Sequence, residues 1–96
     1  HRMNRSIGKR YNVPKQLNSM IDDIVHPGSI MDVKRIMDMG LPLGALIVSV
    51  IREEQEFIPD GHTILRGGDV IEVLLREEDL AEVEHIIEEE CKKVRL

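Results

Sequence analysis

The alternation of hydrophobic and polar residues along this 96-residue chain predicts five strands and two helices. The first strand is expected over residues 20–25. A first helix should run from about Ile30 to Met39, because Ser29 is a good N-cap and Asp32 completes a pair that resembles a capping box. Gly40 should end this helix.

The second strand, residues 45–52, is the most informative segment because hydrophobic residues occupy both of its faces. An antiparallel sheet in a small domain normally leaves one face polar and open to water. The strand must therefore be covered on both sides. A second copy of the chain across a twofold interface is the favoured cover. The alternative is a central strand enclosed within the monomer.

The second half of the chain predicts a meander of strands followed by a helix. Residues 53–56 form a polar tip, and a returning strand starts at Phe57-Ile58. Turns are expected at Pro59-Asp60-Gly61 and at Gly67-Gly68. The two remaining strands are expected at 62–65 and 70–76.

The last helix should begin with Asp79 as its N-cap, and its end is basic, which suits the helix dipole. Its expected buried stripe is Leu80, Val83, Ile87, Cys91 and Val94. These elements predict an α+β fold in the order β-α-β-β-β-β-α. The sheet is small and mostly antiparallel, with the helices packed on one side.

Charge divides the chain into two unequal parts. Residues 1–19 carry five basic side chains and no acid, whereas the rest carries eighteen acids against eight bases. We therefore assign residues 1–19 to a basic linker or tether and residues 20–96 to one folded domain. The basic segment fits either a solvated leader or a cytoplasmic juxtamembrane linker.

Composition argues against a nucleic-acid polymer as partner. The net charge is −5, and Tyr11 and Phe57 are the only aromatic residues. Single-strand binding needs aromatic faces for stacking, and phosphate binding needs a basic surface.

Little in the sequence points to catalysis or metal binding. The four histidines do not lie at ligand spacing, so no metal site is expected. Cys91 has no orienting group beside it in the pattern, so no nucleophilic site is expected either. We predict a protein that is not an enzyme and has no cofactor.

Arg52 is the charged residue whose position is most suggestive, since it ends the apolar strand. If two such strands met at a dimer axis, paired Arg52 side chains would flank an apolar floor of Ile47, Ile51 and Ile58. Arginine binds phosphate groups and stacks on flat rings, so this arrangement suits an anionic ligand. The alternative is a surface arginine paired with Glu53, Glu54 or Glu72.

Several short motifs give residues 24–87 a resemblance to the TrkA-C domain, the C-terminal subdomain of RCK (regulator of potassium conductance) proteins. The matching motifs are Val25-His26-Pro27-Gly28-Ser29, Leu41-Pro42-Leu43-Gly44-Ala45-Leu46-Ile47, Ile51-Arg52, Ile58-Pro59-Asp60-Gly61-His62-Thr63 and Leu65-Arg66-Gly67-Gly68-Asp69-Val70. Val33 departs from the pattern, because family members commonly have glycine there.

The resemblance implies a homodimeric, ligand-sensing domain that works with a cation channel, a potassium uptake system or a cation/proton antiporter. Some members bind cyclic di-AMP in the cleft at their dimer interface. The positions that match that ligand site are Ile47, Arg52, Phe57, Ile58 and Pro59, with His62 as a neighbour.

The sequence and the resemblance together predict a regulatory domain of a potassium or cation transport protein. Its partners would be a second copy, a membrane transporter or channel domain, and a small anionic ligand. It would lie in the cytoplasm, at the inner face of the cell membrane through the parent protein. The alternatives are a purely structural homodimerisation module and, less favoured, a ligand-responsive module of a transcription factor.

Overall fold

A computed structural model describes residues 17–94 of the chain. Four antiparallel strands form one sheet in the order β1-β4-β2-β3. The strands are β1 (Ser19–Ile24), β2 (Ala45–Arg52), β3 (Gln55–Phe57) and β4 (Val70–Leu75). The order places β4, the last strand in sequence, between β1 and β2.

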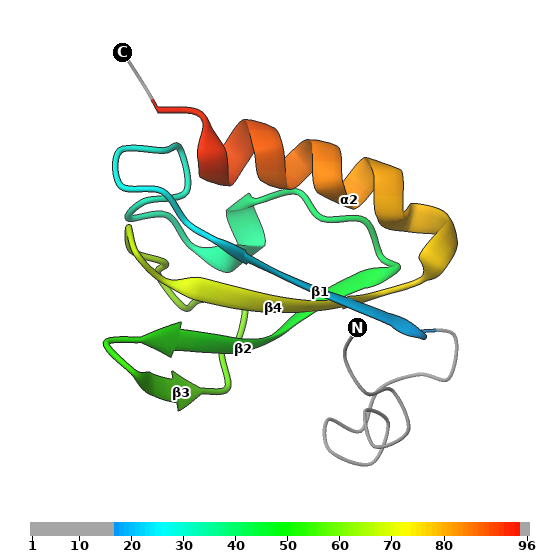
Figure 1. Ribbon diagram of the computed structural model, residues 1–96, viewed down its shortest axis with the longest axis horizontal. Helices are drawn as coiled ribbons and strands as arrows, with labels where there is room; N and C mark the ends of the chain where they lie inside the picture. The colour runs from blue at the N-terminus through cyan, green and yellow to red at the C-terminus, as the bar shows by residue number, and fades with distance from the viewer. Residues whose placement is uncertain (1–16, 95–96) are drawn as a thin grey trace.

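Helical segments lie on one face of this sheet (Figure 1). A one-turn 3₁₀ helix, η1 (Ile36–Asp38), belongs to the long β1–β2 connection. After β4 come the 3₁₀ turn η2 (Glu77–Asp79), the helix α2 (Leu80–Ile87) and a final π-helical turn, η3 (Glu88–Lys92). The expected α+β class, with a small antiparallel sheet and helices on one side, is confirmed.

The main core lies between the sheet and α2. It contains side chains from the inner face of β2 and β4, from the β1–β2 connection and from the C-terminal helix. Its fully buried members include Val50, Ile71, Val73, Val83 and Ile87. Apart from one irregularity in β2, alternate residues of the strands point into this layer, as the two-residue period of a strand requires.

A β-bulge in β2 changes which side chains face the core. The pairing of β2 with β4 shifts between Ile47 and Ser49, so Val48 is the extra residue. Ile47 pairs with Val73 on the inner face, whereas Ile51 pairs with Val70 on the outer face. The strict alternation expected from the sequence placed Ile47 and Ile51 on one face, and that expectation is wrong.

The expected helix over residues 30–39 does not form beyond the single turn η1. Residues 33–36 instead run antiparallel to residues 63–65: Val33 N–H donates to the Leu65 carbonyl at 2.8 Å, and Ile36 N–H donates to the Thr63 carbonyl at 2.9 Å. Long-range backbone hydrogen bonds therefore replace those of the helix. The expected strand over residues 62–65 does not form either. One isolated bridge, between Arg35 and Ile64, is found in its place.

Asp32 caps loops and not a helix. Its carboxylate accepts hydrogen bonds from Gly28 N–H at 2.8 Å and from Gly67 N–H at 2.9 Å. It therefore joins its own turn to the turn at Gly67, which lies 35 residues further along the chain. The capping-box pattern correctly indicated that the Asp32 side chain binds backbone N–H groups. These N–H groups belong to loops and not to the first turn of a helix.

The β2–β3 hairpin is tighter than predicted. Glu53 and Glu54 have φ values of 52° and 69°, which match a two-residue type I′ turn. Strand β3 consequently starts at Gln55, within the segment expected to be a polar tip. The turn lacks the Asn-Gly signature of this class, so its sequence did not reveal it.

The C-terminal helix also differs in detail. Asp79 occupies the predicted N-cap position, but its side chain makes no capping hydrogen bond and pairs with Arg76 at 2.8 Å instead. Val83, Ile87 and Cys91 are buried as expected, but Val94 is 56% exposed. The expected tether, residues 1–19, falls almost wholly outside the described residues and stays a prediction. Leu17, within it, is buried against Val48 and Leu74.

Replacing Val33 by glycine should raise the free energy of unfolding by about 1 kcal/mol, measured by urea denaturation. Val33 has a φ of 71°, in the left-handed region that a β-branched residue adopts at a cost, and its side chain is 58% exposed. The matched control is Val94→Gly, a similarly exposed valine without a left-handed backbone, which should lower stability. A loss of stability in Val33→Gly would show that its backbone is unstrained.

Candidate ligand-binding site

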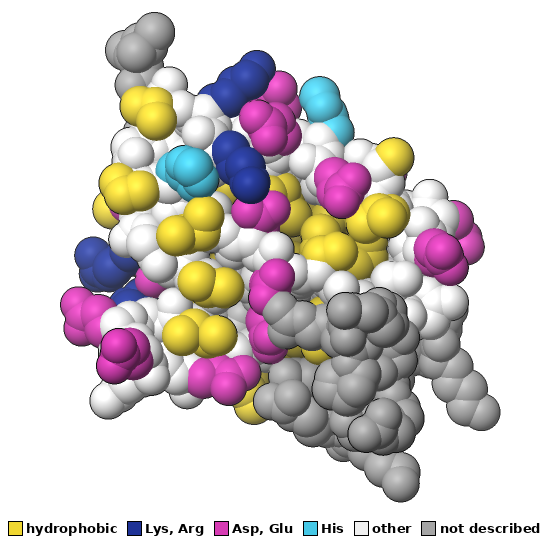
Figure 2. Space-filling view, viewed as in Figure 1, with side chains coloured by type: hydrophobic (Ala, Val, Ile, Leu, Met, Phe, Trp, Pro, Cys, Tyr) yellow, Lys and Arg dark blue, Asp and Glu magenta, His cyan; other side chains and the backbone are white. Residues whose placement is uncertain are grey.

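The sheet face opposite α2 carries a file of hydrophobic side chains that crosses three strands. Strand pairing aligns Ile24 of β1, Val70 of β4 and Ile51 of β2 on this outer face. Ile24 is 39% exposed, and Val70 and Ile51 are half-buried. Figure 2 shows hydrophobic side chains gathered in such a file on the face turned to the viewer. Because β2 is hydrophobic on both faces, apolar surface remains on the face of the sheet opposite α2.

A polar row lies beside this file. Glu72 pairs in register with Asp22 and with Ser49, and the Ser49 hydroxyl hydrogen-bonds the Glu56 carboxylate. Glu72 is only 8% exposed and Ser49 is fully buried. Beyond this row, Val48 and Leu74 are buried with Leu17, while Leu46 is 46% exposed. The second face is therefore covered in part by the chain itself and open along the Ile24–Ile51 file.

The expected site residue Ile47 does not reach this open surface. It is 5% exposed and packs in the main core beneath the helical layer. The bulge at Val48 is the cause. Its extra residue shifts the alternation of side chains along β2, so that Ile47 and Ile51 point to opposite faces of the sheet. Ile51 takes the outward position that the sequence analysis gave to both residues.

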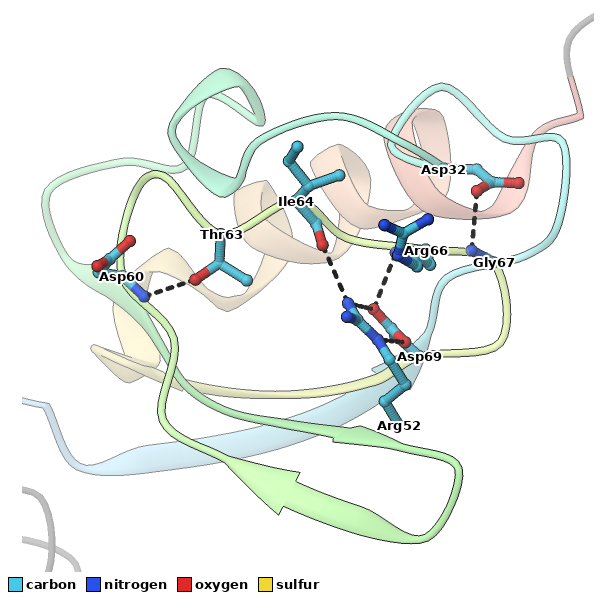
Figure 3. A network of polar contacts seen from close by, with 8 residues as sticks. All are labelled: Asp32, Arg52, Asp60, Thr63, Ile64, Arg66, Gly67 and Asp69. Carbon is cyan, nitrogen blue, oxygen red and sulfur yellow. Dashed lines mark hydrogen bonds and ion pairs between the residues drawn. The ribbon is translucent and has the colours of Figure 1, made fainter.

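Arg52, the second expected site residue, is held by Asp69. Its Nε donates to one carboxylate oxygen of Asp69 at 2.9 Å, and its Nη2 donates to the other at 2.7 Å. Nη2 also donates to the Ile64 carbonyl at 3.0 Å (Figure 3). This is the bidentate geometry that makes arginine–carboxylate pairs strong. The hydrogen bonds to Asp69 raise the pKa of Arg52 above its usual value.

Asp69 is the residue that the sequence analysis missed. Its side chain is 1% exposed, and it additionally accepts a hydrogen bond from Arg66 N–H at 2.8 Å. The expected alternatives, a pair with Glu53, Glu54 or Glu72, are not the hydrogen bonds that Arg52 makes. The strand register accounts for the contact: Ile51 pairs with Val70, so the next residue of β2 lies opposite the residue that precedes β4. This register is set by tertiary pairing, so the sequence carried no signal for Asp69.

The same turn is attached to the exit of β1. Val25 N–H donates to the Asp69 carbonyl at 2.8 Å, and Gly68 N–H donates to the Val25 carbonyl at 2.7 Å. His26 N–H then donates to the Cys91 carbonyl at 2.8 Å, near the end of the helical layer. Arg52 is thus linked through Asp69 to both the first strand and the C-terminal segment.

Phe57 lies against Arg52. The guanidinium carbon lies 5.2 Å from the centroid of the Phe57 ring, which is a cation–π distance. Ile58, next in the chain, is 78% exposed, and Pro59 is half-buried. The β2–β3 hairpin and the residue that follows it therefore combine a cation, an aromatic ring and an exposed aliphatic side chain.

His62 lies on the same return segment and is exposed. Asp60 shapes this segment as an Asx turn: its carboxylate accepts from His62 N–H at 2.8 Å, and its own N–H donates to the Thr63 hydroxyl at 3.0 Å. Of the six expected site residues, the structure brings Arg52 and Phe57 into contact, with Ile58, Pro59 and His62 following along the same segment. It places Ile47 elsewhere.

The other reactive groups among residues 17–94 do not form a second site. Burial raises the pKa of the Cys91 thiol to about 12, so the buried sulfur is protonated and weakly nucleophilic at neutral pH. Across residues 17–94 no group of three His, Cys, Asp or Glu side chains is placed to hold a metal ion. None of the helices formed by these residues has the length and apolar character needed to cross a membrane.

Replacing Arg52 by methionine should lower the free energy of unfolding by about 3 kcal/mol, because the buried Asp69 carboxylate loses its cationic partner. Arg35→Met is the matched control: Arg35 pairs with Asp38 at 3.3 Å, but both side chains are more than 40% exposed. The control should cost less than about 1 kcal/mol. Equal losses in urea denaturation would contradict a special role for the Arg52–Asp69 pair.

Comparison with known proteins agrees with the fold and the sequence motifs. The model of the TrkA-C domain matches residues 20–88. The Trk system potassium uptake protein TrkA homolog of Archaeoglobus fulgidus is 39% identical over 61 residues, which are 64% of this chain. The chain spans 14% of the length of that relative.

Solved structures show the same architecture at low sequence identity. An RCK domain with cda has a TM-score of 0.60 and 20% identity, and the match covers 71% of this chain and 96% of that one. The RCK_C domain dimer of S. agalactiae BusR in complex with c-di-AMP has a TM-score of 0.58 and 22% identity, covering 71% and 93%.

A third structure, S. agalactiae BusR in complex with its busAB-promotor DNA, has a TM-score of 0.58 and 23% identity, covering 84% of this chain and 42% of that one. This neighbour gives no support to the expectation that nucleic-acid polymers are excluded as partners. The family model covers nearly all of the folded region, from β1 to the end of α2. The chain therefore belongs to the TrkA-C domain family, as its motifs predicted.

Proposed function

We propose that this chain is a homodimeric, ligand-sensing domain that regulates a potassium or cation transport protein. It would act in the cytoplasm, at the inner face of the membrane through that parent protein, which is a channel, an uptake system or a cation/proton antiporter. The ligand is a small anion of the cyclic dinucleotide class, with cyclic di-AMP as the first candidate. The domain itself performs no catalysis and needs no cofactor.

The observation that carries the proposal is the end of the β2–β3 hairpin, where Arg52 and Phe57 are in contact beside the exposed Ile58. A cyclic dinucleotide has flat rings and phosphate groups. Aromatic and aliphatic side chains suit the rings, and a guanidinium suits the phosphates. We propose Arg52, Phe57, Ile58 and Pro59 as its contacts, with His62 as a neighbour.

The same end of the sheet supports the twofold arrangement. Ile51 immediately precedes Arg52 and belongs to the exposed file with Val70 and Ile24. A second copy placed on this file would bury apolar surface. Arg52 lies at the same end of β2 but points to the opposite face of the sheet, toward Asp69. A ligand that bridges both copies favours one dimer arrangement only through its higher affinity for it. The parent transporter would respond to that shift.

Two relatives support the choice of ligand. An RCK domain was solved with cda, and the RCK_C domain of BusR was solved as a dimer in complex with c-di-AMP. The curated relative is a potassium uptake protein, which supports the transport assignment.

The dimer is tested by placing a charge in the exposed file. The wild-type chain should sediment as a dimer at micromolar concentration, and Ile24→Glu should shift it to the monomer because two carboxylates would be buried at the interface. Leu43→Glu is the control: Leu43 is fully exposed and lies outside the strands, so its replacement should leave the dimer intact. A wild-type monomer that is well folded would contradict the proposed interface.

The ligand is tested by calorimetry with cyclic di-AMP. We expect one nucleotide per two chains, and about tenfold weaker binding in Ile58→Ser, since this exposed side chain contributes contact area and little to stability. Leu43→Ser, another exposed aliphatic position, should bind as the wild type does. A dimer that gives no heat and no melting shift would favour a purely structural dimerisation module.

A further inference from the structure

The hydrogen bonds of Arg52 leave one nitrogen of its guanidinium for a ligand. A guanidinium has five N–H groups: one on Nε and two on each terminal nitrogen. Nε–H is directed to Asp69, and the two N–H groups of Nη2 are directed to Asp69 and to the Ile64 carbonyl. Among the described residues no acceptor engages Nη1, so its two N–H groups are available.

The geometry also fixes where that nitrogen points. The Nε–Nη2 edge faces Asp69 in Figure 3, and the planar guanidinium carries Nη1 on the side opposite that edge. Phe57, whose ring centroid is 5.2 Å from the guanidinium carbon, covers part of the group. The N–H groups of the Nε–Nη2 edge form the fork that arginine normally offers to a phosphate. This fork is therefore already occupied within the protein.

Releasing that fork would be costly. Asp69 is 1% exposed, and without Arg52 its charge would be buried with only the Arg66 N–H donor among its hydrogen bonds described above. It also anchors the turn that holds Val25 at the exit of β1. We expect the pair to stay closed on binding, because opening it would leave the buried Asp69 carboxylate without its cationic partner.

We propose that Asp69 tunes the affinity of the ligand site: it occupies the fork of Arg52, offsets its charge and leaves Nη1 alone to meet the anionic group. The inference rests on the proposed function, since it specifies how that same site recognises its anion. Asp69 acts through Arg52 and does not touch the ligand. The site is consequently weaker for anions than a free arginine at the same place would be.

The first test uses the wild-type chain and NMR of the arginine side-chain nitrogens during titration with cyclic di-AMP. The Arg52 Nε–H resonance should keep its position, because this group stays on Asp69, while the Nη resonances should shift. A large Nε–H shift together with loss of the Asp69 hydrogen bond would overturn the inference and leave the proposed function standing. No binding at all would overturn both.

The second test is Asp69→Asn, with affinity for cyclic di-AMP measured by calorimetry below the unfolding transition. The variant should be less stable yet bind about tenfold more tightly, because a like charge near the ligand is removed and the fork of Arg52 is released. A residue with a purely structural role would weaken binding or leave it unchanged, and either result would overturn the inference.

Asp32→Asn is the matched control for stability. Asp32 also accepts a hydrogen bond from a backbone N–H of the same turn, that of Gly67 at 2.9 Å, but it is not a hydrogen-bond partner of Arg52. It should lose stability without any gain in affinity. An equal gain in affinity in both variants would show that loosening of the turn, and not the charge on Asp69, controls binding.

Discussion

The ion pair between Arg52 and Asp69 joins three parts of this domain. Arg52 ends β2, Asp69 precedes β4, and the Ile64 carbonyl that Arg52 also binds belongs to the loop between β3 and β4. Through its backbone, Asp69 additionally holds the exit of β1. A carboxylate that is 1% exposed needs such a partner, because an unpaired buried charge is strongly unfavourable. The long loops of this small fold are ordered around that requirement.

In the proposed ligand site, the pair also connects stability to recognition. The arginine that suits an anionic ligand is the one that the fold uses to neutralise a buried acid, so the two roles share five N–H groups. A domain that senses a ligand gains from this arrangement, since the site is held in one geometry before binding and little order has to be created. The links from Asp69 to Val25, and from His26 to the Cys91 carbonyl, extend that order to the ends of the folded region.

The outer face of the sheet illustrates how a small irregularity changes which side chains are exposed. One extra residue at Val48 separates Ile47, which packs in the core, from Ile51, which lies in the exposed file with Val70 and Ile24. Without the bulge, both would share one face. In the proposed dimer, this surface and Arg52 lie at the same end of β2.

The sequence by itself determined the strands β1, β2 and β4, the C-terminal helix and the α+β class, because local periodicity and β-branched residues report directly on these elements. Its motifs also identified the family and pointed to Arg52 as a contact of the proposed ligand site. Tertiary structure alone decided that residues 30–39 pair with a distant loop, that Val33 adopts a left-handed backbone, and that Asp69 holds Arg52. These features depend on hydrogen bonds between segments far apart in the chain, and no local pattern records which partner a backbone or carboxylate group will find.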